Sequence, residues 1–350
     1  MNLRCTMAAW PFALSRRQRI FSRVTENLMQ NRLFSTVRES CAKVAERARY
    51  VKIDRQFLSD YARSLPVSEA LNPVMDTENH FCEDPETMLV YFLVLDCINF
   101  GSGWFSSLNL ESGMNNGYFT IASRLKNDFI ARGCYQARFL QKITAEDCSL
   151  IFKQDKNSAE AGALMAYFAA ALNAFGDFLT AEFAGSCSRL VAAAGCSAAA
   201  LAEILLKMPF YRDCFLYEDI EVFLLKRAQI TASDLHIAFS GQSYGRFDDI
   251  GELTIFADNL VPHVLQVDGL LTYEKSLAER ISAGIHLESG SAEEIELRAC
   301  SVHAVELLRG EYAAHGVKIT SQGLDYLLWN RGLALEYCSR PSHVTRCVYY

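Results

Sequence analysis

Apolar residues recur at the spacing of an amphipathic helix through most of the chain, whereas few stretches alternate with period two over more than four residues. The clearest case is the alanine-rich stretch 158–183, where Leu164, Phe168 and Leu172 return every four positions and predict a buried helix. Helical patterns also cover residues 37–50, 85–100, 118–130, 197–207, 221–238, 252–271 (with a new helix start at Pro262) and 293–309. The sequence therefore predicts a mainly α fold.

The chain is long enough for one large domain. At about 100–200 residues per domain, 350 residues make one large unit or two closely packed ones. Apolar residues make up 51% and charged residues 21%, so a sizeable core can be buried. Because there is no internal repeat and no Ser/Pro linker, we expect a single domain. The most apolar runs, 88–95 and 161–176, are shorter than the ~18 residues of a membrane span, so we expect core helices and no membrane partner.

The first 24 residues differ in composition from the rest. They contain five arginines and no acidic residue before Glu26. This composition is typical of an organelle transit peptide, but it fits a basic N-terminal extension equally well. We therefore expect the folded domain to span residues 25–350. The expected location is the cytoplasm, or a mitochondrion or plastid if residues 1–24 are a transit peptide.

The charge balance and the missing motifs exclude several classes of protein. With 34 Lys and Arg against 41 Asp and Glu, the net charge is −7, and no basic run marks a duplex nucleic-acid partner. The sequence contains no GxGxxG, GxxxxGKS/T, GxSxG or HExxH motif, which argues against Rossmann, P-loop, α/β-hydrolase and zincin chemistry. The 12 cysteines form no CxxC pair and no zinc spacing, so we expect free thiols in a reducing compartment and no metal site.

Two charged positions stand out against apolar sequence. Asp258 follows Phe256 and Ala257 and precedes Pro262, so it is either a partly desolvated carboxylate in an apolar wall or a helix cap. Lys226 and its neighbour Arg227 interrupt the run VFLLKRAQI. A cation here lies beside an anionic substrate group or a carboxylate, or extends its charged end into water.

A second polar pair lies within the apolar run LVLDCINF. Asp96 and Asn99 are three residues apart and therefore share one helix face. A buried carboxylate needs a partner, so Asp96 either caps a neighbouring helix or helps to read the polar edge of a heterocycle. In the second case Phe100 or Trp104 is available to stack on that heterocycle.

Charged residues in 293–309 have a simpler explanation. Glu296 and Arg298 are polar positions between apolar ones, and the default expectation is a structural ion pair with another helix. His263 and His303 are isolated, so a core or surface role is favoured over catalysis.

Taken in order, eight segments resemble the queuosine salvage proteins, the queuosine 5′-phosphate N-glycosylase/hydrolase family. The resemblance covers residues 30–350, and its KRAQ and FAD segments are the most specific. The segments are VRESCAKVAE, LVLDCINF, FYRDC, LLKRAQITASDL, FDDIGELTIFADNLVPHVL, EEIELRACSVHAVELL, DYLLWNRG and RCVYY.

This resemblance implies both a fold and a reaction. The implied fold is mainly helical and related to the helix–hairpin–helix DNA glycosylases. The implied reaction is hydrolysis of the N-glycosidic bond of queuosine 5′-phosphate, which releases queuine for reinsertion into tRNA by a separate enzyme, together with ribose 5-phosphate. No metal or organic cofactor is implied.

The resemblance also assigns candidate residues. Asp258, matching the Asp of the FAD segment, would stabilise positive charge on the ribose, and Lys226, matching the Lys of KRAQ, would lie beside it. A 7-deazapurine has no N7 to protonate, so the base itself must be held firmly. Alternatives are a hydrolase of the unphosphorylated nucleoside or another deazapurine, and a non-catalytic binder of modified bases. The predicted substrate-binding residues are Asp96, Asn99, Phe100, Trp104, Phe256, Arg227 and Arg298.

Overall fold

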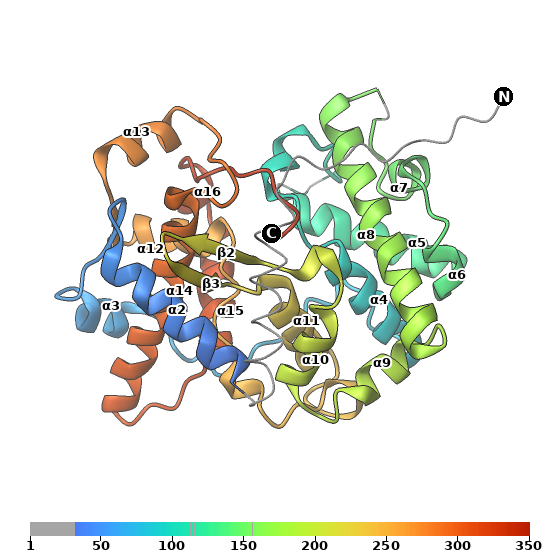
Figure 1. Ribbon diagram of the computed structural model, residues 1–350, viewed down its shortest axis with the longest axis horizontal. Coiled ribbons are helices and arrows are strands. Elements are labelled where there is room, and N and C mark those ends of the chain that lie inside the picture. Colours follow the sequence, from blue (N-terminus) through green and yellow to red (C-terminus); the bar gives the residue numbers. More distant parts are fainter. Residues whose placement is uncertain (1–31, 113, 115, 156) are drawn as a thin grey trace.

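The computed structural model describes residues 32–112, 114, 116–155 and 157–350 as a single, mainly helical domain (Figure 1). The predicted N-terminal extension, residues 1–24, lies outside the described residues. The α-helices are α2 (Leu33–Arg47), α3 (Leu58–Ser64), α4 (Pro85–Cys97), α5 (Gly117–Arg132), α6 (Ala137–Leu140), α7 (Ala145–Ile151), α8 (Ala159–Phe183), α9 (Cys187–Ala193), α10 (Ala198–Leu205), α11 (Lys226–Ala238), α12 (Leu260–Val267), α13 (Lys275–Ser282), α14 (Ala292–Ala314), α15 (Ser321–Gly332) and α16 (Leu335–Cys338). Short 3₁₀ turns are η1 (Ser102–Ser107), η2 (Pro209–Tyr211), η3 (Ser243–Gly245) and η4 (Ile250–Glu252).

The helices form two groups that meet along α11. Figure 1 shows α4 to α9 on one side and α2, α3 and α12 to α16 on the other. In the first group α8 packs on α6 and α7, and in the second α14 packs on α2 and α3. Helix α11 contacts α4 and α10. The core runs through both groups without a break, which places the start of α11 at the centre of the molecule.

Most predicted helices are confirmed, and their ends follow from local capping. Helix α8 begins after Ser158, whose hydroxyl accepts a hydrogen bond from the N–H of Ala161 at 3.3 Å. Helix α4 begins with Pro85, and the side chain of Asp84 caps it. Helices α2, α5, α10 and α14 cover four other predicted stretches with shifts of a few residues at their ends.

Two helix predictions are wrong at their N-terminal ends. Residues 221–238 are not all helical, because β2 (Cys214–Tyr217) and β3 (Ile220–Phe223) form an antiparallel hairpin and α11 starts only at Lys226. A strand of only four residues is too short for its periodicity to distinguish it from one helical turn. Within 252–271, an extended segment precedes α12, and β4 (Leu271–Tyr273) follows, paired with β1 (Val51–Ile53).

Helix α8 is the one described helix that is long and apolar enough to cross a membrane, by length and composition alone. Half of its most apolar window is buried inside the protein (50%). Its buried face includes Leu164, Phe168 and Leu172, as the helical spacing predicts. The cysteines among the described residues are all free thiols, and most of them are buried.

Candidate active site

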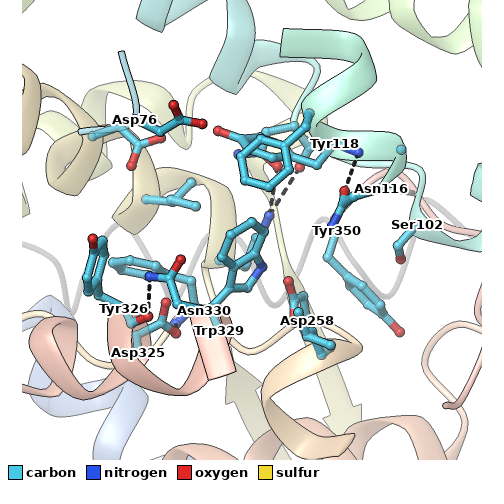
Figure 2. Close-up of a pocket in the computed structure, with 18 of the residues that line it drawn as sticks. Asp76, Ser102, Asn116, Tyr118, Asp258, Asp325, Tyr326, Trp329, Asn330 and Tyr350 are labelled. Atoms are coloured by element: carbon cyan, nitrogen blue, oxygen red, sulfur yellow. Dashed lines mark hydrogen bonds between the residues drawn. The ribbon is translucent and has the colours of Figure 1, made fainter. Parts of the chain in front are cut away.

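A cavity of about 470 Å³ opens where the two groups of helices meet. Its walls come from the end of α4, η1, the start of α5, one face of α11, the segment before α12, and α15 (Figure 2). The apolar part of the wall includes Phe100, Phe105, Phe256 and Trp329. Aromatic walls with a few polar groups are typical of a site for a small organic molecule.

Lys226 is the first residue of α11 and projects into this cavity. Its side chain is buried, with 4% of the residue exposed. The ammonium Nζ donates to Oδ1 of Asn99 at 3.0 Å and to the Asn99 carbonyl at 3.3 Å. Burial lowers the pKa of Lys226, while the neighbouring carboxylates, Asp258 first, oppose this change. Lys226 is also the only Lys or Arg side chain that the described residues contribute to the cavity wall.

Asp258 lines the cavity and also caps a helix. Its Oδ1 accepts from the backbone N–H of Leu260 at 2.7 Å and of Val261 at 3.4 Å, at the start of α12. Both interpretations of this residue from the sequence are therefore correct, since one oxygen serves the helix. The other oxygen, Oδ2, receives no hydrogen bond from any described residue and remains available to a ligand in the cavity.

Three further carboxyl groups surround Lys226. Burial raises the pKa of Asp96 to about 7 and that of Asp325 to about 7. It raises the pKa of Asp234 well above its usual value, and the adjacent carboxyl of Asp96 adds to this rise. One ammonium cannot balance three further carboxylates, so part of the group Asp96, Asp234 and Asp325 holds protons near neutral pH. The site thus contains carboxyl groups that can donate protons.

The segment that carries Asp258 is fixed from two helices. Asp325 on α15 accepts a hydrogen bond from the N–H of Phe256 at 2.8 Å. Arg298 on α14 donates from Nε to the carbonyl of Ala257 at 2.8 Å. Because the backbone on the N-terminal side of Asp258 is held by buried side chains, its carboxylate has little freedom to move.

Of the nine residues predicted for the site, five line the cavity: Lys226, Asp258, Asn99, Phe100 and Phe256. The other four do not, and their burial explains why. Asp96 is 0% exposed and lies behind Asn99, whose Nδ2 donates to its Oδ1 at 3.4 Å. Trp104 packs against Tyr167, with ring centroids 5.7 Å apart, rather than against the cavity.

The two predicted arginines hold the fold together instead of facing the cavity. Arg227 donates to four backbone carbonyls, those of Asp96, Cys97, Phe210 and Val348. Arg298 is 0% exposed and pairs with Asp213. The ion pair is structural, as expected, but its partner lies in the loop before β2 rather than on another helix, and Glu296 has no part in it. The geometry does not support direct substrate contact by either arginine, since their donors are used by buried partners.

Sequence reasoning missed the acids and aromatic residues that complete the cavity. The sequence does carry a signal for them, because cavity-lining residues recur at helical spacing along two helices. On α11 the cavity face comprises Lys226, Ile230, Ser233, Asp234 and Ile237, and on α15 it comprises Gln322, Asp325, Tyr326, Trp329 and Asn330. Polar residues at every third or fourth position, facing inward with apolar ones, mark a lined cavity rather than a solvated face.

The sequence is similar to those of several known proteins. The family model described as queuosine salvage protein matches residues 79–350. A protein of Sphaerobacter thermophilus named queuosine 5′-phosphate N-glycosylase/hydrolase is 35% identical over 88% of this chain and 95% of its own. Proteins of the same name from Dictyostelium discoideum and Mus musculus are 32% and 30% identical, over 90% and 89% of this chain and 98% of each relative. The chain belongs to the queuosine salvage protein family.

Proposed function

We propose that this protein hydrolyses the N-glycosidic bond of queuosine 5′-phosphate and releases queuine and ribose 5-phosphate. Membership of the queuosine salvage family supports the reaction, and the relatives' shared name supports the substrate. The observation that carries the proposal is a carboxylate with one free oxygen, Asp258, beside the buried ammonium of Lys226 in an aromatic cavity.

In the proposed reaction the C1′–N9 bond breaks and its electron pair leaves with the base. Positive charge then builds on the ribose, and the free Oδ2 of Asp258 stabilises it at short range. The oxygen of a water molecule bonds to C1′, and Asp258 accepts the proton that this water loses. The ammonium of Lys226 lies near Asp258, so the two opposite charges attract each other and keep Asp258 directed into the cavity.

The leaving base also needs stabilisation. A 7-deazaguanine cannot be protonated at N7, so the negative charge of the leaving base must be met at N3, N9 or the exocyclic carbonyl oxygen. Asp234 and Asp325 line the cavity, and burial raises the pKa of both. As neutral carboxyl groups they can donate a hydrogen bond to these acceptors and give the leaving base its proton, which a carboxylate cannot do. The proton that Asp258 takes from water balances the proton given to the base.

Asp76 is our candidate partner for the cationic aminomethyl group of the base. It lines the cavity wall on the side away from Asp258 (Figure 2). Burial opposes its ionisation, but hydrogen bonds from the side chain and backbone of Asn79 outweigh burial and lower the pKa of Asp76. Asp76 therefore presents a negative charge to the cavity, whereas Asp96 does not line it.

A related proposal concerns ancestry of the fold. We propose that the fold is related to the helix–hairpin–helix DNA glycosylases, as the family resemblance implies. The mainly helical domain and a lysine that opens a helix close to an aspartate support this relation. A superposition in which α11 and α12 have no counterparts in those enzymes would contradict it.

Hydrolysis of the unphosphorylated nucleoside is the second candidate. It is favoured by the single cationic side chain in the described cavity wall, which already bonds to Asn99. Burial also lowers the pKa of His80, the only histidine in that wall, so it adds no charge for a phosphate at neutral pH.

The test is to incubate purified protein separately with queuosine 5′-phosphate and with queuosine, and to follow queuine by mass spectrometry. We expect a higher kcat/KM for the nucleotide and a kcat at least about 100-fold lower for Asp258→Asn. A higher kcat/KM for the nucleoside would support the second candidate. Tight binding of queuine with no ribose release from either substrate would contradict both proposals and indicate a non-catalytic binder.

A further inference from the structure

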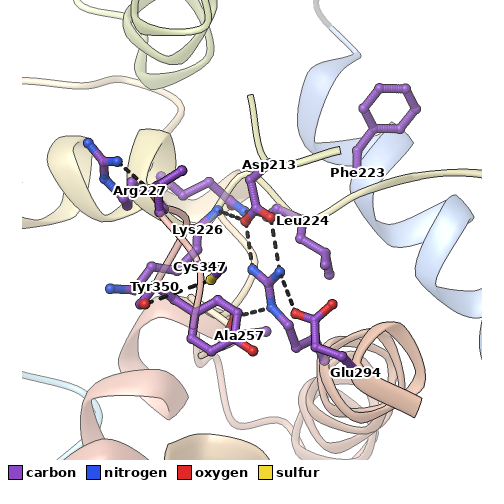
Figure 3. A network of polar contacts seen from close by, with 12 residues as sticks. Asp213, Phe223, Leu224, Lys226, Arg227, Ala257, Glu294, Cys347 and Tyr350 are labelled. Atoms are coloured by element: carbon purple, nitrogen blue, oxygen red, sulfur yellow. Dashed lines mark hydrogen bonds and ion pairs between the residues drawn. The ribbon is translucent and has the colours of Figure 1, made fainter. Parts of the chain in front are cut away.

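The backbone positions of Lys226 and Asp258 are connected through one buried ion pair. The chain of contacts runs from the N–H of Lys226 to Asp213, from Asp213 to Arg298, and from Arg298 to the carbonyl of Ala257. Figure 3 shows Asp213, Lys226, Ala257 and Glu294 gathered in this network. Two segments about thirty residues apart in sequence are thereby held at a fixed separation.

Asp213 caps the N-terminus of α11 in place of the residue that directly precedes the helix. The residue before the helix, Leu225, has a left-handed backbone with φ of 54° and makes no side-chain cap. Oδ2 of Asp213 accepts from the Lys226 N–H at 3.0 Å, and its carbonyl accepts from the N–H groups of Leu224 at 3.1 Å and Leu225 at 3.3 Å. A left-handed non-glycine residue persists only where its surroundings fix it, and Asp213 does so here.

Arg298 reaches both segments at once. Its Nη1 and Nη2 donate to the two carboxylate oxygens of Asp213 at 2.9 and 2.6 Å, while Nε donates to the Ala257 carbonyl at 2.8 Å. The guanidinium lies 4.4 Å from the ring centroid of Tyr350. Only a planar group with donors on two edges can make both contacts in a single geometry.

The network is fully buried, so its charges depend on one another. Arg298 and Glu294 are 0% exposed, and Asp213 is 2% exposed. Burial alone disfavours the charge on Arg298, but Asp213 and Glu294 outweigh burial and raise the pKa of Arg298 well above its usual value. The guanidinium therefore stays charged, and its hydrogen bonds do not exchange with water.

We propose that Arg298 and Asp213 are positioning residues that set the separation and orientation of Lys226 and Asp258. Neither side chain lines the cavity, so each acts through the backbone of the residue it holds. This inference rests on the proposed hydrolase function. It replaces the substrate-binding role that the sequence suggested for Arg298.

The test compares Arg298→Lys with Arg38→Lys. Lysine keeps the charge of Arg298 but cannot hold both Asp213 oxygens and the Ala257 carbonyl, so the reacting groups should separate. A displacement near 1 Å costs about 100-fold in rate, so we expect kcat to fall about 10- to 100-fold with KM changed less than about threefold. Arg38 makes the same kinds of contact with Glu306 and the Glu252 carbonyl, remote from the cavity, and its variant should keep wild-type kcat.

A second measurement separates positioning from simple loss of structure. In a Lys226→Ala background, where one of the two positioned groups is missing, Arg298→Lys should cost less than about threefold in residual kcat. A loss of the same size in both backgrounds, or wild-type kcat in Arg298→Lys, would overturn the inference. If Arg298→Lys fails to fold, Asp213→Asn, which keeps the shape and one acceptor oxygen, replaces it with the same expected kcat loss.

A crystal structure of Arg298→Lys decides the question independently of activity. We expect the Ala257–Asp258 peptide to shift relative to Lys226 by more than about 0.5 Å, the tolerance of a productive site. An unmoved peptide would overturn the positioning role. A wild-type protein without hydrolase activity would overturn the proposed function alone, since the displacement would still be measurable.

Discussion

Replacing Asp325 by asparagine tests whether the cavity stores a proton on a buried carboxyl group. Asp325 is buried on α15, and burial raises its pKa to about 7; the charge on Asp258 adds to this rise. Asparagine keeps an oxygen that can accept the hydrogen bond from the Phe256 N–H, but it has no proton to lose. The substitution therefore removes the titration and preserves the contact.

The size of the effect follows from linkage. In the unfolded chain an aspartate has a pKa of ~3.9. Between pH ~4 and pH about 7 the folded protein therefore holds a proton on Asp325 that the unfolded chain has lost. The stability that this proton represents is complete below ~4 and is lost as the pH rises through about 7. At ~1.4 kcal/mol per pH unit, the wild type should lose about 2–3 kcal/mol from this group between pH 5 and pH 8.

Urea unfolding at pH 5 and pH 8 measures this loss. The free energy of unfolding of Asp325→Asn, relative to wild type, should be higher at pH 8 than at pH 5 by about 2–3 kcal/mol. Asp248→Asn, at an exposed site with 69% of its side chain accessible, is the matched control and should show no such change. A relative free energy that is the same at both pH values for Asp325→Asn would refute the stored proton.

Three further substitutions test the site and the packing around it. Asp258→Asn should lower kcat at least about 100-fold. Its melting temperature should stay near that of the wild type, because asparagine also caps α12. Wild-type kcat in this variant would remove Asp258 from the mechanism. Lys226→Ala should also lose at least about 100-fold in kcat, because it removes the cation near Asp258. Wild-type kcat in this variant would contradict the electrostatic role of Lys226. Gly323→Ala should cost about 1–3 kcal/mol in chemical unfolding, since its Cβ would lie 2.1 Å from the Ala70 carbonyl oxygen; unchanged stability would show that this contact relaxes freely.

The sequence predicted what depends on neighbours along the chain. The mainly helical fold and the places of α4 and α8 follow from the local spacing of apolar residues. Lys226 and Asp258 were predicted because each interrupts an apolar run, and the family segments name both. Both line one cavity, and their place in a functional site and their chemical roles stay predictions.

What the sequence could not predict depends on tertiary packing. The hairpin that ends at Phe223 resembles a helical turn until its partner strand is known. Arg227 and Arg298 were predicted to bind substrate. An arginine within apolar sequence can bind a ligand or donate to buried backbone carbonyls, and the sequence alone does not distinguish the two; here both arginines donate to carbonyls. The partner of Arg298, Asp213, is 85 residues away, and nothing in its local spacing marks that pairing.

The buried pair of Asp213 and Arg298 has a consequence for how the protein becomes active. The hairpin region, α11, the segment before α12, and α14 each contribute one member of that network. A collapsed intermediate with native helices but loose packing would hold Lys226 and Asp258 without their working distance. The separation of Lys226 and Asp258 is therefore a property of all four packed segments together, and no single helix sets it.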